Sequence, residues 1–355
     1  MEKLDLDVNQ FPTLTYNFLN INRTHLTAEI TSSVQVEKTL LPKGITLEES
    51  QSLMAKDLPA LESGMGKEFD SAFDKVISEN KLNIYNYSVE ENAHVESPVR
   101  ISFLAKEKCA GEIVIRAKKN SSSDFIIDYS GSADVFGLRI KIIVDENAFV
   151  NLSTVNLLSK HTECFTSMAS LLKDCAKVSV VQIELGSKKT ITGNYINLLG
   201  LKAFTDNDLA YVTDKDQVLD INYVARHTGK QTQSFMNVKG VVNSNGQKTW
   251  RGTIDFVKGC KDSKGDERED VLLLNPLVVN KSLPVILCDE EAVEGSHGAS
   301  IGKLSQSMLF YMQSRGVDEK TAEKILTKAK IMNVAKKIKD EQLIKEIKKY
   351  LDEAF

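Results

Sequence analysis

The chain has 355 residues, 42% of them hydrophobic and 26% charged, which suits one large globular domain with a smaller appendage, or two domains. Its formal net charge of -4 argues against a general nucleic-acid binder, because phosphate contacts need a basic excess or a basic stripe. No apolar run is long enough to span a bilayer, and residues 1–7 are acidic where a secretory signal is basic and then apolar. We therefore expect a cytoplasmic protein with neither membrane nor nucleic-acid partners.

Residues 1–90 are predicted to form a partly helical N-terminal cap. An opening segment contains Phe11-Pro12, and a later stretch has apolar residues at three- and four-residue spacing, as on the buried face of a helix. The apolar residues of this stretch are Leu58, Leu61, Met65, Phe69, Phe73, Val76 and Ile77.

Residues 91–300 are predicted to be β-rich, because apolar or alternating runs are separated by polar or Gly/Asn/Asp-rich turns. The expected strands cover residues 99–104, 112–116, 125–129, 138–144, 178–185, 190–199, 217–224, 234–242, 250–257 and 283–288. A sandwich, a barrel or a parallel solenoid would each give this spacing. Hairpin signals are scarce, apart from Asn245-Gly246, and their scarcity favours a parallel stack of coils.

Residues 301–355 are predicted to be helical. Ser305 is placed to cap a first helix that runs through Tyr311, Gly316 ends it, and Asp318 is placed to cap a second. An apolar stripe continues from Ala322 to the end of the chain, while the many lysines of this region are interpreted as a solvated face. The stripe either packs on the β-rich domain or binds a partner.

Motifs of common enzymes are missing from the sequence. The run Gly186-Ser187-Lys188-Lys189-Thr190 lacks the upstream glycine of a phosphate-binding loop and is interpreted as a turn between strands. No serine-hydrolase elbow, zinc-protease helix or dinucleotide fingerprint is present. The charged run 261–270 is interpreted as an exposed loop, and we expect a protein that is not an enzyme.

The five cysteines are widely scattered and show no metal-ligand spacing, so we expect most of them to be reduced, buried and inert. We also expect Cys109 and Cys288 to lie in strands as small apolar residues.

One histidine stands apart from the others. His25, His94 and His161 show no convergent partners, and His227 is expected in a turn, hydrogen-bonded to the backbone. His297, in Gly295-Ser296-His297-Gly298, has small neighbours that leave its imidazole open to bind iron or zinc. Alternatively, this run is only a tight turn that caps the next helix.

Two adjacent motifs give this chain a family resemblance. Ser296-His297-Gly298-Ala299 with Gly302, followed by Leu309-Phe310-Tyr311 and Ser314-Arg315-Gly316-Val317, resembles the C-terminal signature of the SufB/SufD family of iron–sulfur cluster assembly proteins. Lys239-Gly240-Val241 and Trp250-Arg251-Gly252 extend the resemblance, which covers about residues 170–355. Val278 stands where SufB proteins carry a scaffold cysteine, and Gly295-Ser296-His297 stands at their acidic E-H-E triplet. The SufD-like branch is therefore the better match, although Gly295 replaces a cysteine found in several SufD proteins.

The resemblance implies a fold and a role. The fold is mainly β, with a right-handed parallel β-helix at residues 91–300, a partly helical region at 1–90 and an α-helical C-terminal subdomain at 301–355. The implied role is a scaffold that pairs with a SufB-type paralogue, or with a second copy of itself, and docks a SufC-type ABC ATPase through its C-terminal end. Motif and docking residues would be Gly298, Gly302, Phe310, Tyr311, Arg315 and Gly316.

His297, with Ser296 beside it, would face the partner interface. There it would meet a transient iron ion or iron–sulfur cluster, and no tightly bound cofactor is expected. Two alternatives remain open: a β-helical carbohydrate-active enzyme, which the single tryptophan and the lack of an export signal disfavour, and a structural adaptor without a metal role.

Overall fold

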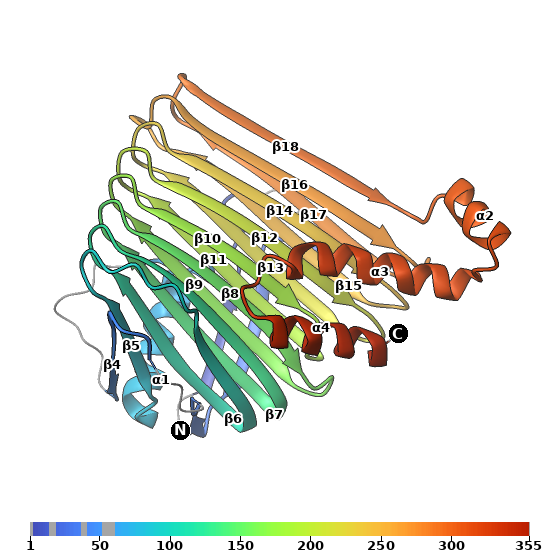
Figure 1. Ribbon diagram of the computed structural model, residues 1–355, viewed down its shortest axis with the longest axis horizontal. Coiled ribbons are helices and arrows are strands. Elements are labelled where there is room, and N and C mark those ends of the chain that lie inside the picture. The colour runs from blue at the N-terminus through green and yellow to red at the C-terminus, as the bar shows by residue number, and fades with distance from the viewer. Residues whose placement is uncertain (1–2, 14–18, 37–40, 52–60, 355) are drawn as a thin grey trace.

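Most of the chain forms a parallel β-solenoid in the computed structural model, which describes residues 3–13, 19–36, 41–51 and 61–354 (Figure 1). The solenoid strands are β6 (Val99–Ala117), β7 (Ser122–Val144), β8 (Phe149–Leu158), β9 (Glu163–Leu172), β10 (Lys177–Glu184), β11 (Lys189–Leu198), β12 (Phe204–Thr213), β13 (Val218–His227), β14 (Gln233–Val242), β15 (Gln247–Phe256), β16 (Ser263–Leu273), β17 (Val279–Cys288) and β18 (Val293–Gly302). The prediction of a parallel β-helix is confirmed, and a sandwich and a barrel are excluded.

Each coil contributes one strand to each of two stacks. Strands β8, β10, β12, β14, β16 and β18 pair in parallel and form the even stack, while β9, β11, β13, β15 and β17 form the odd stack. The long strand β7 pairs with β8 along its first half and with β9 along its second, so it joins the two stacks. Stacking coils in this way pairs the backbone of each strand with the coils before and after it.

The solenoid interior is filled by alternate residues of every strand, because side chains in a strand point to opposite faces in turn. In β13, for example, Leu219, Ile221 and Tyr223 face the core, where Trp250 of β15 packs 5.2 Å from the Tyr223 ring. This rule made much of the fold predictable. Strands β8, β9, β12, β16 and β18 were nevertheless not among the expected ones.

Two local predictions about the solenoid were wrong. Asn245-Gly246 does not close a hairpin: it lies at the corner between β14 and β15, which belong to different stacks, and β14 pairs with β12 and β16 instead. The charged run 261–270 is mostly strand β16 rather than an exposed loop. Of the run Gly186 to Thr190 that was predicted as a turn, the first three residues connect β10 and β11, whereas Lys189 and Thr190 begin β11.

The N-terminal region packs along the odd stack, from the first coils as far as β17, where Leu283 contacts Phe11 and Ile21. Strands β1 (Lys3–Val8) and β2 (Thr24–Glu29) form an antiparallel pair, and β3 (Ser32–Ser33), β4 (Ile45–Ser50) and β5 (Ile84–Val89) extend the sheet beside β6. The predicted helix is α1 (Lys67–Asn80), whose Phe69 and Phe73 are fully buried against Phe165 of β9. Of its predicted apolar residues, Leu61 and Met65 lie before the helix rather than in it, and Leu58 lies outside the described residues.

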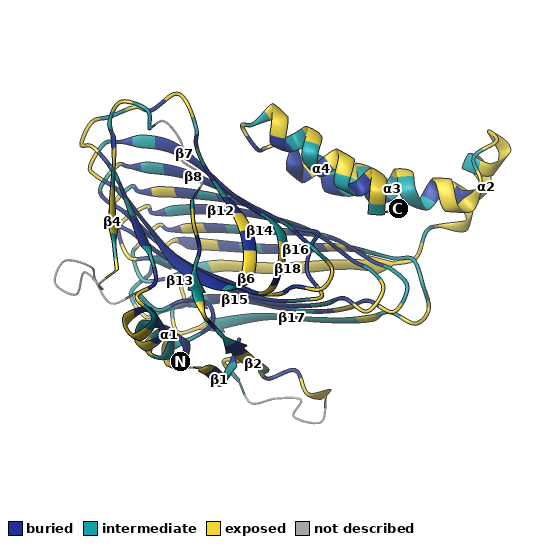
Figure 2. Cartoon of the chain, turned by 90° about the horizontal axis from the view of Figure 1, so that it is seen from below, coloured by how far each residue is buried: buried dark blue, intermediate teal, exposed yellow. Residues whose placement is uncertain are grey.

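Three helices follow β18: α2 (Gln306–Ser314), α3 (Glu319–Ala335) and α4 (Glu341–Ala354). Ser305 and Asp318 cap α2 and α3 as predicted, and Gly316, with a φ of 83°, lies between these helices. Helices α3 and α4 lie against the outer face of the even stack, on the side opposite α1 (Figure 2). None of the helices in the described part of the chain is long and apolar enough to cross a membrane.

The apolar stripe of α3 and α4 packs on the solenoid, as one of the two predicted possibilities required. Ile331, Val334, Leu343, Ile347 and Leu351 are buried with apolar residues of the even stack. Three lysines that were expected in a solvated face instead form ion pairs with solenoid aspartates: Lys330 with Asp270, Lys337 with Asp208 and Lys339 with Asp124.

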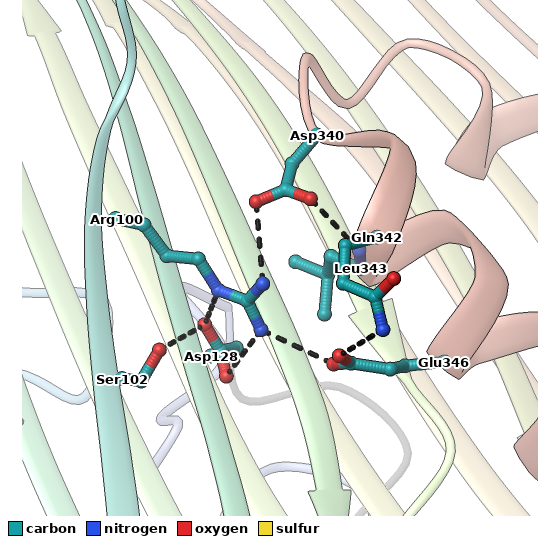
Figure 3. A network of polar contacts seen from close by, with 7 residues as sticks. All are labelled: Arg100, Ser102, Asp128, Asp340, Gln342, Leu343 and Glu346. Atoms are coloured by element: carbon teal, nitrogen blue, oxygen red, sulfur yellow. Dashed lines mark hydrogen bonds and ion pairs between the residues drawn. The ribbon is translucent and has the colours of Figure 1, made fainter.

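A charged network also joins α4 to the first solenoid strands (Figure 3). The Arg100 guanidinium donates to Asp128 at 2.8 Å, to Asp340 at 3.3 Å and to Glu346 at 3.1 Å. Ser102 donates to the same Asp128 carboxylate at 2.8 Å. The last helix is therefore tied to the beginning of the solenoid.

Candidate functional site

The C-terminal end of the solenoid is its open end. Among the described residues, β17 pairs only with β15 and β18 only with β16, so each strand has one edge without a neighbouring strand. Every residue of β18 after Val293 is exposed, whereas the strands in the middle of the stack are largely buried. An unpaired strand edge offers backbone N–H and C=O groups to another chain.

The alternation of side chains along a strand determines the side to which His297 points. The alternative of a tight turn around His297 is wrong, because Gly295, Ser296, His297 and Gly298 all lie within β18. A Cβ on Gly295 would meet the Phe256 ring at 3.0 Å, so Gly295 faces inward, and the alternation of strand residues then places His297 on the same inner side. Ser296 faces outward and donates to Asp266 at 2.6 Å.

Space around β18 is generous. A Cβ on Gly298 or Gly302 would find nothing within 4 Å among the described residues. On the outer side, a cavity of about 640 Å³ is lined by residues of β14, β16 and β18, including Lys239, Arg268 and Ser296. Gly298 and Gly302 share the outward side of Ser296, so the outer face of the strand has room for contacts.

A buried polar cluster lies in the layers beneath His297. The register of the even stack pairs His297 with Glu267 of β16, which is 2% exposed and accepts a 2.5 Å hydrogen bond from the Trp250 indole. Close by, the buried ammonium of Lys248 donates to Glu269 and, at 2.9 Å, to Ser282. Burial raises the pKa of Glu267 to about 7 and lowers the pKa of Lys248.

Sequence reasoning missed this polar cluster. The alternating charges of residues 261–270 predict a solvent-exposed loop, but every second residue from Ser263 to Val271 is buried. The period of two was the available signal. This period did not predict a strand, because most of the inward positions are polar rather than apolar.

The second half of the motif lies on α2 and directly after it. Phe310 is 73% exposed and Tyr311 59% exposed, and only Leu309 of this helix is buried. The Arg315 guanidinium stacks over the Tyr311 ring at 5.4 Å. Helix α2 starts four residues after the end of β18, so the two halves of the motif are neighbours in the chain.

The other histidines have partners that sequence reasoning did not supply. His227 is fully buried at the end of β13, where its two ring nitrogens lie 2.7 Å from the Thr232 hydroxyl and 2.8 Å from the Ser234 hydroxyl. Its partners are therefore side chains rather than the predicted backbone. His25 lies in β2 between Asp5 and Asp7, which raise its pKa through hydrogen bonds.

The cysteines follow the prediction with one exception. Cys109, Cys164 and Cys260 are buried and Cys175 is half-buried, but Cys288, at the end of β17, is exposed. Val278 precedes β17 directly. Within the described ranges, no three His, Cys, Asp or Glu side chains are grouped so as to hold a metal ion.

Comparisons with known proteins agree with the fold and the motifs. A family model described as the SufBD core domain of SUF-system Fe–S cluster assembly matches residues 102–330. The chain is 23% identical over 248 residues to the iron–sulfur cluster assembly protein SufD of Bacillus subtilis, covering 67% of this chain and 56% of that protein. It is 22% identical over 310 residues to a SufBD family protein of Staphylococcus saprophyticus, covering 82% of this chain and 65% of that protein. The chain thus spans less than two thirds of the length of these relatives.

Proposed function

This chain belongs to the SufBD core family of the SUF iron–sulfur cluster assembly system, and we propose that it is the non-ATPase, SufD-like scaffold subunit of a cytoplasmic assembly complex. It catalyses no reaction by itself. It pairs through the open end of its solenoid with a SufB-type paralogue and binds a SufC-type ABC ATPase through its C-terminal helices. The observation that carries this proposal is the position of His297 on the inner side of β18 at that open end.

The open end supports pairing with another solenoid. The free edges of β17 and β18 have the backbone groups with which a partner strand would continue each stack. A paralogue with the same architecture would present matching edges, and the exposed, glycine-containing β18 leaves room for its side chains. Such pairing would enclose His297 between the two subunits.

The residues at this end support transient iron binding. Imidazole is a good ligand for iron at neutral pH, because it is partly neutral there and binds through a ring nitrogen. A cluster is held mostly by several thiolates, and β18 carries none. The partner subunit therefore supplies the thiolates and the sulfur, while His297 admits or holds iron.

Helix α2 supports ATPase docking. Phe310 and Tyr311 form an exposed aromatic pair, a kind of residue enriched in the buried centres of protein interfaces. Helices α3 and α4 are fixed to the even stack. A force on α2 would therefore reach β18 through the short segment that joins β18 to α2. ATP-driven motion of the ATPase would open the subunit interface by this route.

The test is anaerobic affinity purification of the tagged chain from its native cytosol. Co-purification of an ABC-type ATPase and a cysteine-bearing paralogue is expected, with iron and labile sulfide in the complex. Phe310→Ala should lose the ATPase but keep the paralogue, and Leu104→Ala, which removes an exposed apolar residue from β6, serves as the matched control. Recovery of the chain alone, without ATPase or paralogue, would contradict the proposal.

A further inference from the structure

We propose that Glu267 is a second iron ligand of this chain, and that it acts together with His297 at the open end of the solenoid. The inference deepens the proposed function and rests on it, because it assigns the site a ligand pair of one imidazole and one carboxylate. The ion is ferrous iron on its way into a cluster, and its remaining ligands come from the partner or from water.

Strand register brings the two residues together. His297 and Glu267 are paired positions of adjacent parallel strands, and both face the inside of the solenoid. Paired positions in adjacent strands place their side chains on the same face and one strand spacing, about 4.8 Å, apart at the backbone. His297 is exposed at the open end, so an ion that reaches it from outside lies one layer above Glu267.

One oxygen of the Glu267 carboxylate accepts no hydrogen bond from the described residues. Oε1 accepts from the Trp250 indole, whereas Oε2 is buried and has no hydrogen-bond partner among the described residues. The carboxylate occupies space left by Gly252, where a Cβ would overlap it. A buried carboxylate oxygen without a donor is costly, and coordination of a cation is one of the few ways to offset that cost.

The charge of the cluster favours a cation. The one buried ammonium, that of Lys248, contacts Glu269, and no ion pair to Glu267 exists within the described part of the chain. Two carboxylates therefore share one ammonium in the interior beneath His297. Oxygen and imidazole nitrogen are ligands that ferrous iron accepts, and a His–carboxylate pair leaves its other coordination positions open.

The single tryptophan gives a direct readout. Trp250 is the only tryptophan of the chain and donates to Glu267, so an ion bound at this carboxylate lies close to the indole. We would titrate the full-length protein anaerobically with Fe²⁺, and in parallel with Co²⁺, while recording tryptophan fluorescence. Quenching that saturates at one ion per chain is expected. Iron binding with unchanged fluorescence, or no binding, would overturn the proposal.

Variants then assign the ligands. Glu267→Gln keeps an oxygen for the Trp250 indole, and both it and His297→Ala should weaken Fe²⁺ binding at least about tenfold, since loss of an outer-shell partner alone costs that much. The double variant should bind Fe²⁺ more weakly than either single variant, because each single variant keeps one of the two ligands. Glu294→Gln, an exposed carboxylate on the outer face of β18, is the matched control and should leave binding unchanged. Thermal unfolding verifies that each variant is folded. The fluorescence titration of the wild-type protein tests the proposal even if a variant does not fold.

Failure of this inference is distinguishable from failure of the proposed function. Equal Fe²⁺ affinity of Glu267→Gln and wild type would remove Glu267 as a ligand, while co-purification with the ATPase and the paralogue would still support the scaffold role. Iron quenching of Trp250 without any co-purifying partner would instead keep the ligand pair and remove the scaffold role.

Discussion

The two ends of the solenoid are built in opposite ways. At the first end, α1 packs on the coils, and Phe69, Phe73 and Phe165 form a fully buried aromatic group. The buried Arg139 there is paired with Glu112 and Asp74. At the last end, two strand edges are free, β18 is exposed and a carboxylate oxygen of Glu267 lacks a donor among the described residues. The first end stabilises the fold, whereas the second has free strand edges and exposed side chains with which other molecules can interact.

The largest expected effect of a substitution is at the covered end. Phe73→Ala should lower the free energy of unfolding by about 3–5 kcal/mol, because it removes a fully buried ring and leaves a cavity. Phe310→Ala, at the exposed helix α2, should change it by less than about 0.5 kcal/mol. Urea unfolding of both variants measures the difference. Similar losses at the two positions would remove the contrast between the ends.

The buried histidine should make the solenoid sensitive to acid. Burial lowers the pKa of His227 from 6.5 to about 3, so the unfolded chain takes up a proton in this range that the folded chain does not. The free energy of unfolding, which is highest above pH 6.5, should fall by up to about 5 kcal/mol as the pH falls toward 3. The measurement is the free energy of unfolding against pH for wild type and His227→Asn. Parallel curves for the two proteins would show that His227 is not the group responsible.

The charged network that joins α4 to the first solenoid strands should have a smaller effect. Arg100→Gln leaves Asp128, Asp340 and Glu346 without their shared cation and should cost about 1.5–3 kcal/mol, the range for hydrogen bonds to charged groups. Arg23→Gln, which breaks an exposed pair with Asp7, should cost less than about 1 kcal/mol. Equal losses in urea unfolding would mean that the network does not hold α4 to the solenoid.

Sequence patterns predicted the two ends unequally well. The caps Ser305 and Asp318 and the buried face of α1 were correct, because capping and apolar periodicity are local signals. The strand character of β16 and β18 was missed for two reasons. Gly295-Ser296-His297-Gly298 has a composition typical of turns, and the charged run 261–270, which contains Glu267, has a composition typical of loops. What makes them strands is pairing with a coil about thirty residues earlier, as in His297 with Glu267, and such pairing is not visible in local sequence.

The motif that led to the site was correct in position and wrong in local structure. Ser296 and His297 were predicted in a turn, and the strand instead aims them to opposite sides of the sheet. The polar cluster of Lys248, Trp250 and Glu267 is assembled from two strands of different stacks. No single segment of the sequence therefore predicts it.

The measurement that tests the central claim most directly compares wild type with His297→Ala in the purified complex under anaerobic conditions, with iron and labile sulfide assayed per complex. His94→Ala, which replaces a histidine at the far end of the solenoid bonded to Ser122, is the control. The account predicts that His297→Ala keeps the paralogue and the ATPase but loses iron and sulfide, while His94→Ala retains both. Full cluster content in the His297→Ala complex would contradict the account and leave this chain as a structural adaptor.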